Sequence, residues 1–180
     1  MISGRLFIRI GLLLNTKPII QVRKKAMEEK EAKRVSLELM AAVPDVFLGT
    51  VDSGGFPQVR VMGNLRNKEQ CRIAEELFAG HDEDFLIYML TGNSSDKMQQ
   101  IRANSKVSVY FSNFAGFHTL LLAGNAEEID DPDLKKRIWQ DEWKIHWSGG
   151  PEDPEFLVLK LLPERAKGWY KEGPFEFKLK

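Results

Sequence analysis

The stretch Thr91-Gly-Asn-Ser-Ser-Asp-Lys-Met-Gln-Gln-Ile101 decides how the chain is interpreted, because it lies between two apolar runs. Residues 85–90 (FLIYML) precede it and residues 107–111 (VSVYF) follow it, so the pattern predicts strand, hydroxyl-rich turn, helix and strand. A helix that begins at the serine pair presents unpaired N–H groups and the positive end of its dipole. Such a helix start favours an anion such as phosphate, and Lys97 in the first helical turn adds a positive charge.

The same residues also have an ordinary explanation. Serine and asparagine are common helix caps, and a lysine near a helix start is usually solvated. A helix terminus contributes roughly 0.3 to 2 kcal/mol, whereas micromolar binding requires about −8 kcal/mol. The stretch alone therefore leaves a phosphate site and a simple capped helix open.

The rest of the chain alternates short strands with a few helices. Apolar spacing predicts an amphipathic helix from Met27 to before Pro44 and a short helix within residues 65–82. A further helix begins with Asp131 as its cap and Pro132 at its first position, and extends to about Trp147. Strands are predicted at residues 46–51, 56–63, 85–90, 106–112, 117–129 (with a bulge at Gly124), 155–162, 165–170 and 175–179. This order indicates an α+β domain built on an antiparallel barrel.

Composition limits the classes of protein and of site that this chain can form. The 180 residues suffice for one full core, and 26 basic residues balance 26 acidic ones, which argues against a nucleic-acid-binding protein. The single cysteine, Cys71, fits a reducing cytoplasmic compartment, where we expect it to be a buried small residue. The histidines His81, His118 and His146 lack metal-ligand spacing, so no structural metal is predicted.

Residues 1–25 differ from the remainder. They carry six basic and no acidic residues, with an apolar run from Leu6 to Leu14 that Arg9 interrupts. This run is too short to span a bilayer, which needs roughly 20 residues. We therefore expect a peripheral lead at residues 1–25, one domain at residues 26–180, and no membrane association.

Four blocks of sequence resemble the pyridoxamine-phosphate-oxidase-like FMN-binding split barrels, and most closely their general stress protein branch. The blocks are Gly54–Met62 (GGFPQVRVM), Tyr88–Phe111 (YMLTGNSSDKMQQIRANSKVSVYF), Thr119–Glu127 (TLLLAGNAE) and Leu157–Trp169 (LVLKLLPERAKGW). Their order and spacing carry the resemblance over most of residues 45–170. It implies a six- to eight-stranded antiparallel split β-barrel with flanking helices.

The resemblance also implies a homodimer with two FMN molecules at its interface, and it assigns roles by position. Ser95, Lys97 and the strand residue Arg60 match contacts to the FMN phosphate. The remaining matches lie along or beside the flavin ring: Val61, Met62, Thr91, Thr119 and Trp169. Of these, Thr119 approaches the ring from the facing subunit. Without the resemblance each would be interpreted as a surface, capping or core residue.

Three departures limit what the resemblance implies. Asp96 occupies the place of a phosphate-binding arginine, and Leu65 stands where oxidases have a lysine. After Trp169 the chain continues Tyr-Lys-Glu-Gly-Pro-Phe, in place of the Arg-Leu-His-Asp-Arg-like segment that binds substrate in true oxidases. Oxidation of pyridoxamine phosphate is therefore not expected.

These observations give a leading hypothesis and an alternative. The first is a homodimeric FMN-dependent oxidoreductase that takes electrons from NAD(P)H and passes them to a small-molecule substrate or acceptor that the sequence does not identify. The second is a non-catalytic module that stores or senses a flavin, a deazaflavin or haem. No catalytic acid or base is identified. His118 either faces the pocket or is a satisfied strand histidine, and residues 143–150 form either a lid or packing.

Deleting residues 1–25 should leave the fold, the dimer and flavin binding intact, because few buried contacts should be lost. Thermal melting and size-exclusion chromatography of the truncated chain test this expectation. A melting temperature lower by several degrees, or a dimer that dissociates, would instead make the lead structural.

Overall fold

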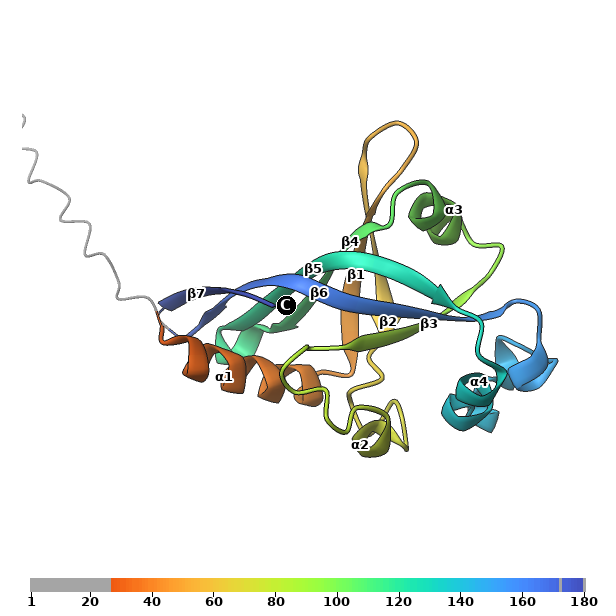
Figure 1. Ribbon diagram of the computed structural model, residues 1–180, viewed down its shortest axis with the longest axis horizontal. Coiled ribbons are helices and arrows are strands. Elements are labelled where there is room, and N and C mark those ends of the chain that lie inside the picture. The colour runs from red at the N-terminus through yellow and green to blue at the C-terminus, as the bar shows by residue number, and fades with distance from the viewer. Residues whose placement is uncertain (1–26, 172, 180) are drawn as a thin grey trace, which may run out of the picture.

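Strand β6 (Phe156–Tyr170) runs through the centre of the computed structural model, which describes residues 27–171 and 173–179 (Figure 1). Strand β5 (His118–Ile129) pairs with β6 along its length, while β3 (Ile87–Gly92) pairs with its first half and β7 (Gly173–Lys178) with its second. Within the described residues the seven strands form one antiparallel sheet, in which six follow the order β2-β1-β4-β5-β6-β3 and β7 lies off this path, paired with β6. The other strands are β1 (Asp45–Val51), β2 (Pro57–Gly63) and β4 (Lys106–Asn113).

The sheet curls because β5 and β6 change register between Ala123 and Gly124. A side chain at Gly124 would place its Cβ 2.7 Å from the Leu162 carbonyl oxygen, so only glycine fits this bulge. The predicted bulge is thus confirmed. The prediction of separate strands at residues 155–162 and 165–170 is wrong, because Pro163 pairs with Gly124 inside one continuous strand. A bulge tolerates proline, which lacks a donor.

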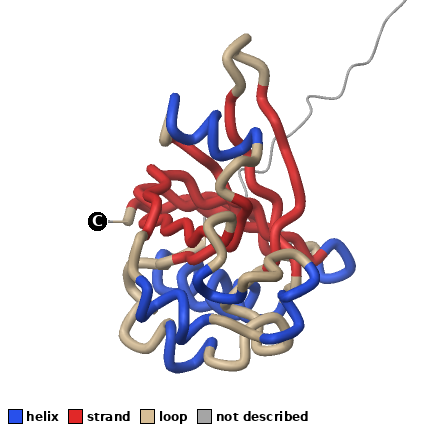
Figure 2. Tube along the Cα trace, turned by 90° about the vertical axis from the view of Figure 1, so that its right-hand side faces the viewer, coloured by secondary structure: helices blue, strands red, loops and turns tan. Residues whose placement is uncertain are grey.

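Strands β2 and β3 stand at the two ends of the strand order, and no ladder joins them. The barrel is therefore split between these strands. The β1–β2 hairpin projects from the body of the molecule, as both views show (Figures 1 and 2). Its Asp52 carboxylate accepts hydrogen bonds from the N–H groups of Gly54 and Phe56, each at 2.9 Å.

Four helices flank the sheet in the described part of the chain: α1 (Glu29–Ala42), α2 (Ala74–Leu77), α3 (Asp96–Ala103) and α4 (Pro132–Ile138). Helix α1 buries its apolar face, including Val35 and Leu39, in the main core. A second core joins α2 and α4 to the start of β6 and contains Cys71. Burial raises the pKa of the Cys71 thiol, as expected of a structural residue.

Two element boundaries differ from the prediction. Strand β3 begins at Ile87 because Phe85 has a φ of 56°, which lies outside the extended region. Helix α4 ends at Ile138 instead of extending to Trp147, and a 3-10 turn, Asp141–Ile145, follows it. The helix stops there because Trp139, Trp143 and Trp147 all pack their rings around the buried Phe156, at centroid distances of 5.2, 6.4 and 4.9 Å.

Gly168→Ala should destabilise the protein by roughly 1 to 3 kcal/mol, the usual cost of overpacking. A Cβ at this position of β6 would collide with the Thr119 carbonyl oxygen and lie 2.5 Å from Phe175 Cζ. Chemical denaturation measures the change. Gly173→Ala is the matched control because nothing lies within 4 Å of its Cβ position, and equal stability of the two variants would refute the packing argument.

Candidate functional site

A groove of about 810 Å³ lies at the split between β2 and β3, beside the start of α3. This volume is within the range of small-molecule and cofactor sites, about 300 to 1,000 Å³. The groove is lined by Gln58, Val59, Arg60, Val61, Met62, Gly63, Leu90, Thr91, Gly92, Ser95, Asp96, Lys97, Gln100, His146 and Trp147. Six of the eight residues singled out in the sequence therefore line one groove.

Arg60 enters the groove from β2 and is held by neutral partners. Its Nη1 donates to Thr50 Oγ1 at 2.5 Å, and its Nη2 donates to Gln100 Oε1 at 2.9 Å. Burial lowers the pKa of the guanidinium from its ordinary value, although arginine remains charged. The sequence analysis did not identify Thr50 or Gln100, because these residues come from β1 and α3 and only the tertiary fold brings them to Arg60.

Lys97 reaches the same groove from the first turn of α3. Burial lowers the pKa of its ammonium group, and the nearby charge of Arg60 lowers it further. The nearby carboxylate of Asp96 acts in the opposite direction and raises the pKa of Lys97, but burial and Arg60 outweigh it. The groove therefore holds two partly desolvated positive charges, an arrangement that favours an anion.

The start of α3 adds backbone donors to these charges. Ser95 occupies the N-cap position, yet its side chain makes no capping hydrogen bond to the helix. The Ser95 hydroxyl instead lies 3.4 Å from Thr91 Oγ1 at the end of β3. First-turn N–H groups without a side-chain cap are suited to an anionic ligand. The exposed Asp96 lines the same groove and opposes this preference with a negative charge.

The turn before α3 is fixed by residues that the sequence analysis missed. Glu155 Oε2 accepts hydrogen bonds from Ser94 N at 2.9 Å and Ser94 Oγ at 2.8 Å, and these bonds lower the pKa of the Glu155 carboxyl. Arg102 donates to the Asn93 carbonyl oxygen at 3.2 Å and pairs with Glu128. These contacts hold the helix start against the barrel, and no local sequence signal connects residues so far apart.

Thr119 and Trp169 lie outside the groove of this chain. They are cross-strand partners on β5 and β6. Thr119 lines a separate hollow with Tyr110, Leu121 and Lys167, and Trp169 donates its indole N–H to the Lys171 carbonyl oxygen at 2.7 Å. Both residues belong to the outward face of the sheet.

The expectations for His118 and for residues 143–150 have different outcomes. His118 is buried away from the groove, where its ring meets Tyr170 edge-on at 4.7 Å and burial lowers its pKa. Among the described residues its Nε2 has no hydrogen-bond partner, so His118 is a packed histidine and not the satisfied strand histidine of the second interpretation. His146 and Trp147, from the segment considered as a lid, line the groove directly.

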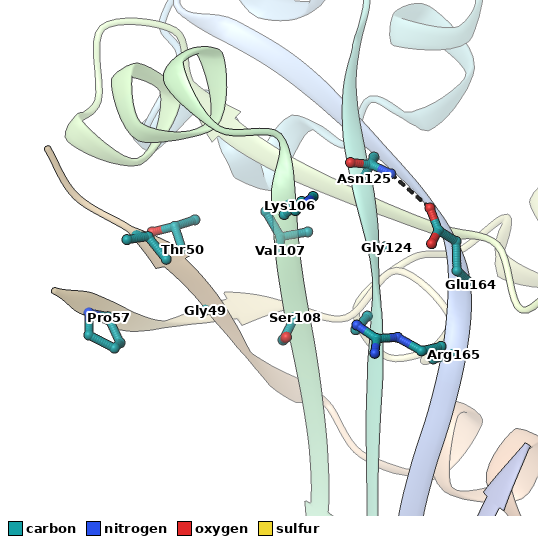
Figure 3. Close-up of a pocket in the computed structure, with 12 residues that line it drawn as sticks. Gly49, Thr50, Pro57, Lys106, Val107, Ser108, Gly124, Asn125, Glu164 and Arg165 are labelled. Atoms are coloured by element: carbon teal, nitrogen blue, oxygen red, sulfur yellow. Dashed lines mark hydrogen bonds between the residues drawn. The ribbon is translucent and has the colours of Figure 1, made fainter. Parts of the chain in front are cut away.

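A second hollow, of about 490 Å³, lies over β1, β4, β5 and β6 (Figure 3). It presents charges of both signs, including Lys106, Glu164 and Arg165, and Asn125 Nδ2 donates to Glu164 Oε1 at 2.8 Å. It contains none of the eight predicted residues. We therefore take the groove at the barrel split as the candidate site.

Residues 27–171 and 173–179 contain no group of three or more histidine, cysteine, aspartate or glutamate residues able to hold a metal ion. Within the same residues, no helix is both long and apolar enough to cross a membrane.

Comparison with protein families decides the relationship. The family model described as "Pyridoxamine 5'-phosphate oxidase like" matches residues 77–180. The chain belongs to this family. Sequence resemblance had indicated the same family from four separate blocks. A comparison with curated proteins found no significant match.

Solved structures share the fold of this family member. A Clostridium acetobutylicum protein described as related to general stress protein 26 of B. subtilis has a TM-score of 0.66 and 22% identity, over 84% of this chain and 96% of that chain. General stress protein 26 from Bacillus anthracis str. Sterne has a TM-score of 0.62 and 20% identity, over 83% of this chain and 99% of that chain. A heme binding protein from Mycobacterium smegmatis has a TM-score of 0.57 and 12% identity, over 82% of this chain and 57% of that chain. The predicted split barrel is thereby confirmed.

Lys97→Met should stabilise the ligand-free protein by about 0.5 kcal/mol, because it removes a desolvated charge that Arg60 repels. The folded pKa of Lys97 is lowered, so its destabilising effect is full below that pKa and disappears as pH approaches the ordinary lysine value. The Lys97→Met variant should therefore melt at a higher temperature than wild type at about pH 7.5, and this difference should become smaller toward about pH 10. Lys30→Met, at an exposed position of α1, is the control. A Lys97→Met variant less stable than wild type at neutral pH would contradict this account.

Proposed function

We propose that this protein is an FMN-binding flavoprotein that acts as a homodimeric oxidoreductase. The observation that carries the proposal is the pair of cations, Arg60 and Lys97, which share one groove where burial lowers the pKa of both and the one nearby carboxylate in the described chain, Asp96, only partly offsets their charge. A phosphate monoester supplies the missing negative charge. Charge-assisted hydrogen bonds to such a group are stronger than neutral ones.

The donor set fits the phosphate of FMN. Arg60 offers a guanidinium fork, Lys97 an ammonium group, and the start of α3 offers backbone N–H groups next to Ser95. In the proposal Val61 and Met62 lie along the flavin ring through their backbone, and Thr91 lies beside the cofactor. The residues of this chain thus bind and orient the cofactor and limit the access of water. FMN, when bound, would supply the redox chemistry.

The homodimer accounts for the two predicted residues that lie outside the groove. Thr119 and Trp169 share the outward face of the sheet with exposed apolar residues, among which Val59 and Val61 are 68% and 58% exposed. An uncovered apolar sheet face favours burial against a second copy. In the dimer that we propose, the partner subunit's Thr119 and the partner subunit's Trp169 would approach the flavin bound in this groove.

The proposed electron donor is NAD(P)H, and the acceptor is a small molecule. We do not propose pyridoxamine phosphate oxidation, because the residues after Trp169 do not match the oxidase substrate segment. Residues 1–25 lie outside the described residues, and we propose that they are peripheral to a cytoplasmic protein.

The second candidate is a non-catalytic module that binds or senses a flavin, a deazaflavin or haem, and one observation favours haem. A fold neighbour is described as a heme binding protein, and His146 at the groove offers an imidazole of the kind that ligates haem iron. The absorption spectrum of the purified protein distinguishes the candidates. Flavin bands support the leading proposal, a Soret band supports haem, and NAD(P)H consumption separates an enzyme from a carrier.

Arg60→Ala and Lys97→Ala should each weaken FMN binding by roughly 1.5 to 3 kcal/mol while leaving riboflavin binding nearly unchanged, because riboflavin lacks the phosphate. Fluorescence titration of both ligands measures the effect. Lys30→Ala is the matched control, since this exposed lysine lies on α1. An equal loss for both ligands would rule out phosphate contacts by these residues.

Asp96→Arg should tighten FMN binding several-fold, because it reverses a charge that lines the groove near the proposed phosphate position. Asp96→Asn should give an intermediate affinity. The same titration detects both changes. Unchanged affinity in the two variants would mean that the Asp96 carboxylate faces solvent and does not influence the phosphate.

A further inference from the structure

A smaller chamber, of about 290 Å³, adjoins the groove. Gly63, Leu90, His146 and Trp147 line both cavities, so the chamber opens beside the proposed cofactor position. Its other lining residues are Asp45, Leu65, Gln70 and Trp143. A cavity of about 150 Å³ can accept benzene. The chamber therefore has room for one substituted ring.

Two indole rings, those of Trp143 and Trp147, form an aromatic wall of the chamber, and packing fixes both. Trp143 and Trp147 pack around the buried Phe156 at centroid distances of 6.4 and 4.9 Å. The segment that carries them is tied to the opposite wall, because Gln140 Nε2 donates to the Gln70 carbonyl oxygen at 2.7 Å. Indole rings fixed in this way offer flat faces that stack on a planar ring and attract a cation.

The charge of the chamber differs in sign from that of the groove. Lysine and arginine are absent from its described lining, and the carboxylate of Asp45 is its one side chain with a fixed charge. Within the described chain Asp45 has no ion-pair partner. An anionic group in the chamber would therefore meet a like charge and no cation, whereas a positive group would meet an unpaired carboxylate.

We infer that this chamber is the substrate subsite, and that it takes a planar aromatic ring that is uncharged or, preferably, positively charged. Its role as a substrate subsite rests on the proposed flavin function. Phosphorylated and carboxylated aromatic compounds are disfavoured there. In this proposal the groove binds the anionic cofactor, and the chamber selects a ring without negative charge.

Three probes of nearly identical shape test this inference: benzamidine (cationic), benzamide (neutral) and benzoate (anionic). Calorimetry and tryptophan fluorescence at about pH 7.5 measure their binding to the whole protein, with and without saturating FMN. Benzamidine should bind most tightly and benzoate at least about tenfold more weakly, a difference of about 1.4 kcal/mol. Benzamidine should also perturb the absorption bands of bound FMN.

Asp45→Asn should bring the affinities of benzamidine and benzamide to within about threefold of each other, because the variant lacks the carboxylate that favours the cation. Asp130→Asn, whose side chain is 93% exposed beside α4, is the matched control and should change neither affinity. Benzoate binding as tight as that of benzamidine, or no binding by any probe, would overturn the inference. FMN titration is followed separately by flavin absorbance, so loss of flavin binding alone would refute only the proposed function.

Discussion

The candidate site depends on the approach of two cations that share a single nearby carboxylate in the described chain, Asp96. Arg60 on β2 and Lys97 on α3 are brought into one groove, and burial lowers the pKa of each. A folded chain that keeps two such charges together incurs a desolvation and repulsion cost, which a bound anion removes. The proposed function follows from this constraint, because the phosphate of a bound FMN would satisfy the cations and the uncapped helix start together.

Three features of the fold position Arg60 and the start of α3: the bulge in the sheet, the turn before α3 and a contact from α3 to Arg60. The bulge at Gly124 curls the sheet, and the barrel remains split between β2 and β3. Glu155 ties down the turn that precedes α3, and Gln100 on that helix reaches back to Arg60. Each support comes from a different element, so the geometry of the groove belongs to the whole barrel and not to the turn alone.

Local chemistry explains which features were predictable from the sequence. The cap at Asp131 depends on neighbouring residues, and an isolated glycine within an apolar strand marked the bulge at Gly124; both were predicted correctly. The end of α4 was missed because packing around Phe156 overrides the helical spacing of the tryptophans. In the candidate site, the resemblance supplied Arg60 and Lys97, but their supporting residues and the chamber beside the groove arise only from tertiary contacts.

The central claim is that the groove recognises a phosphate attached to a flavin. The most direct test is a calorimetric titration of the ligand-free protein with FMN and with riboflavin at constant ionic strength. The account predicts that FMN binds with micromolar or tighter affinity and that riboflavin binds at least about tenfold more weakly. Equal affinities for the two ligands, or no binding of FMN, would contradict it.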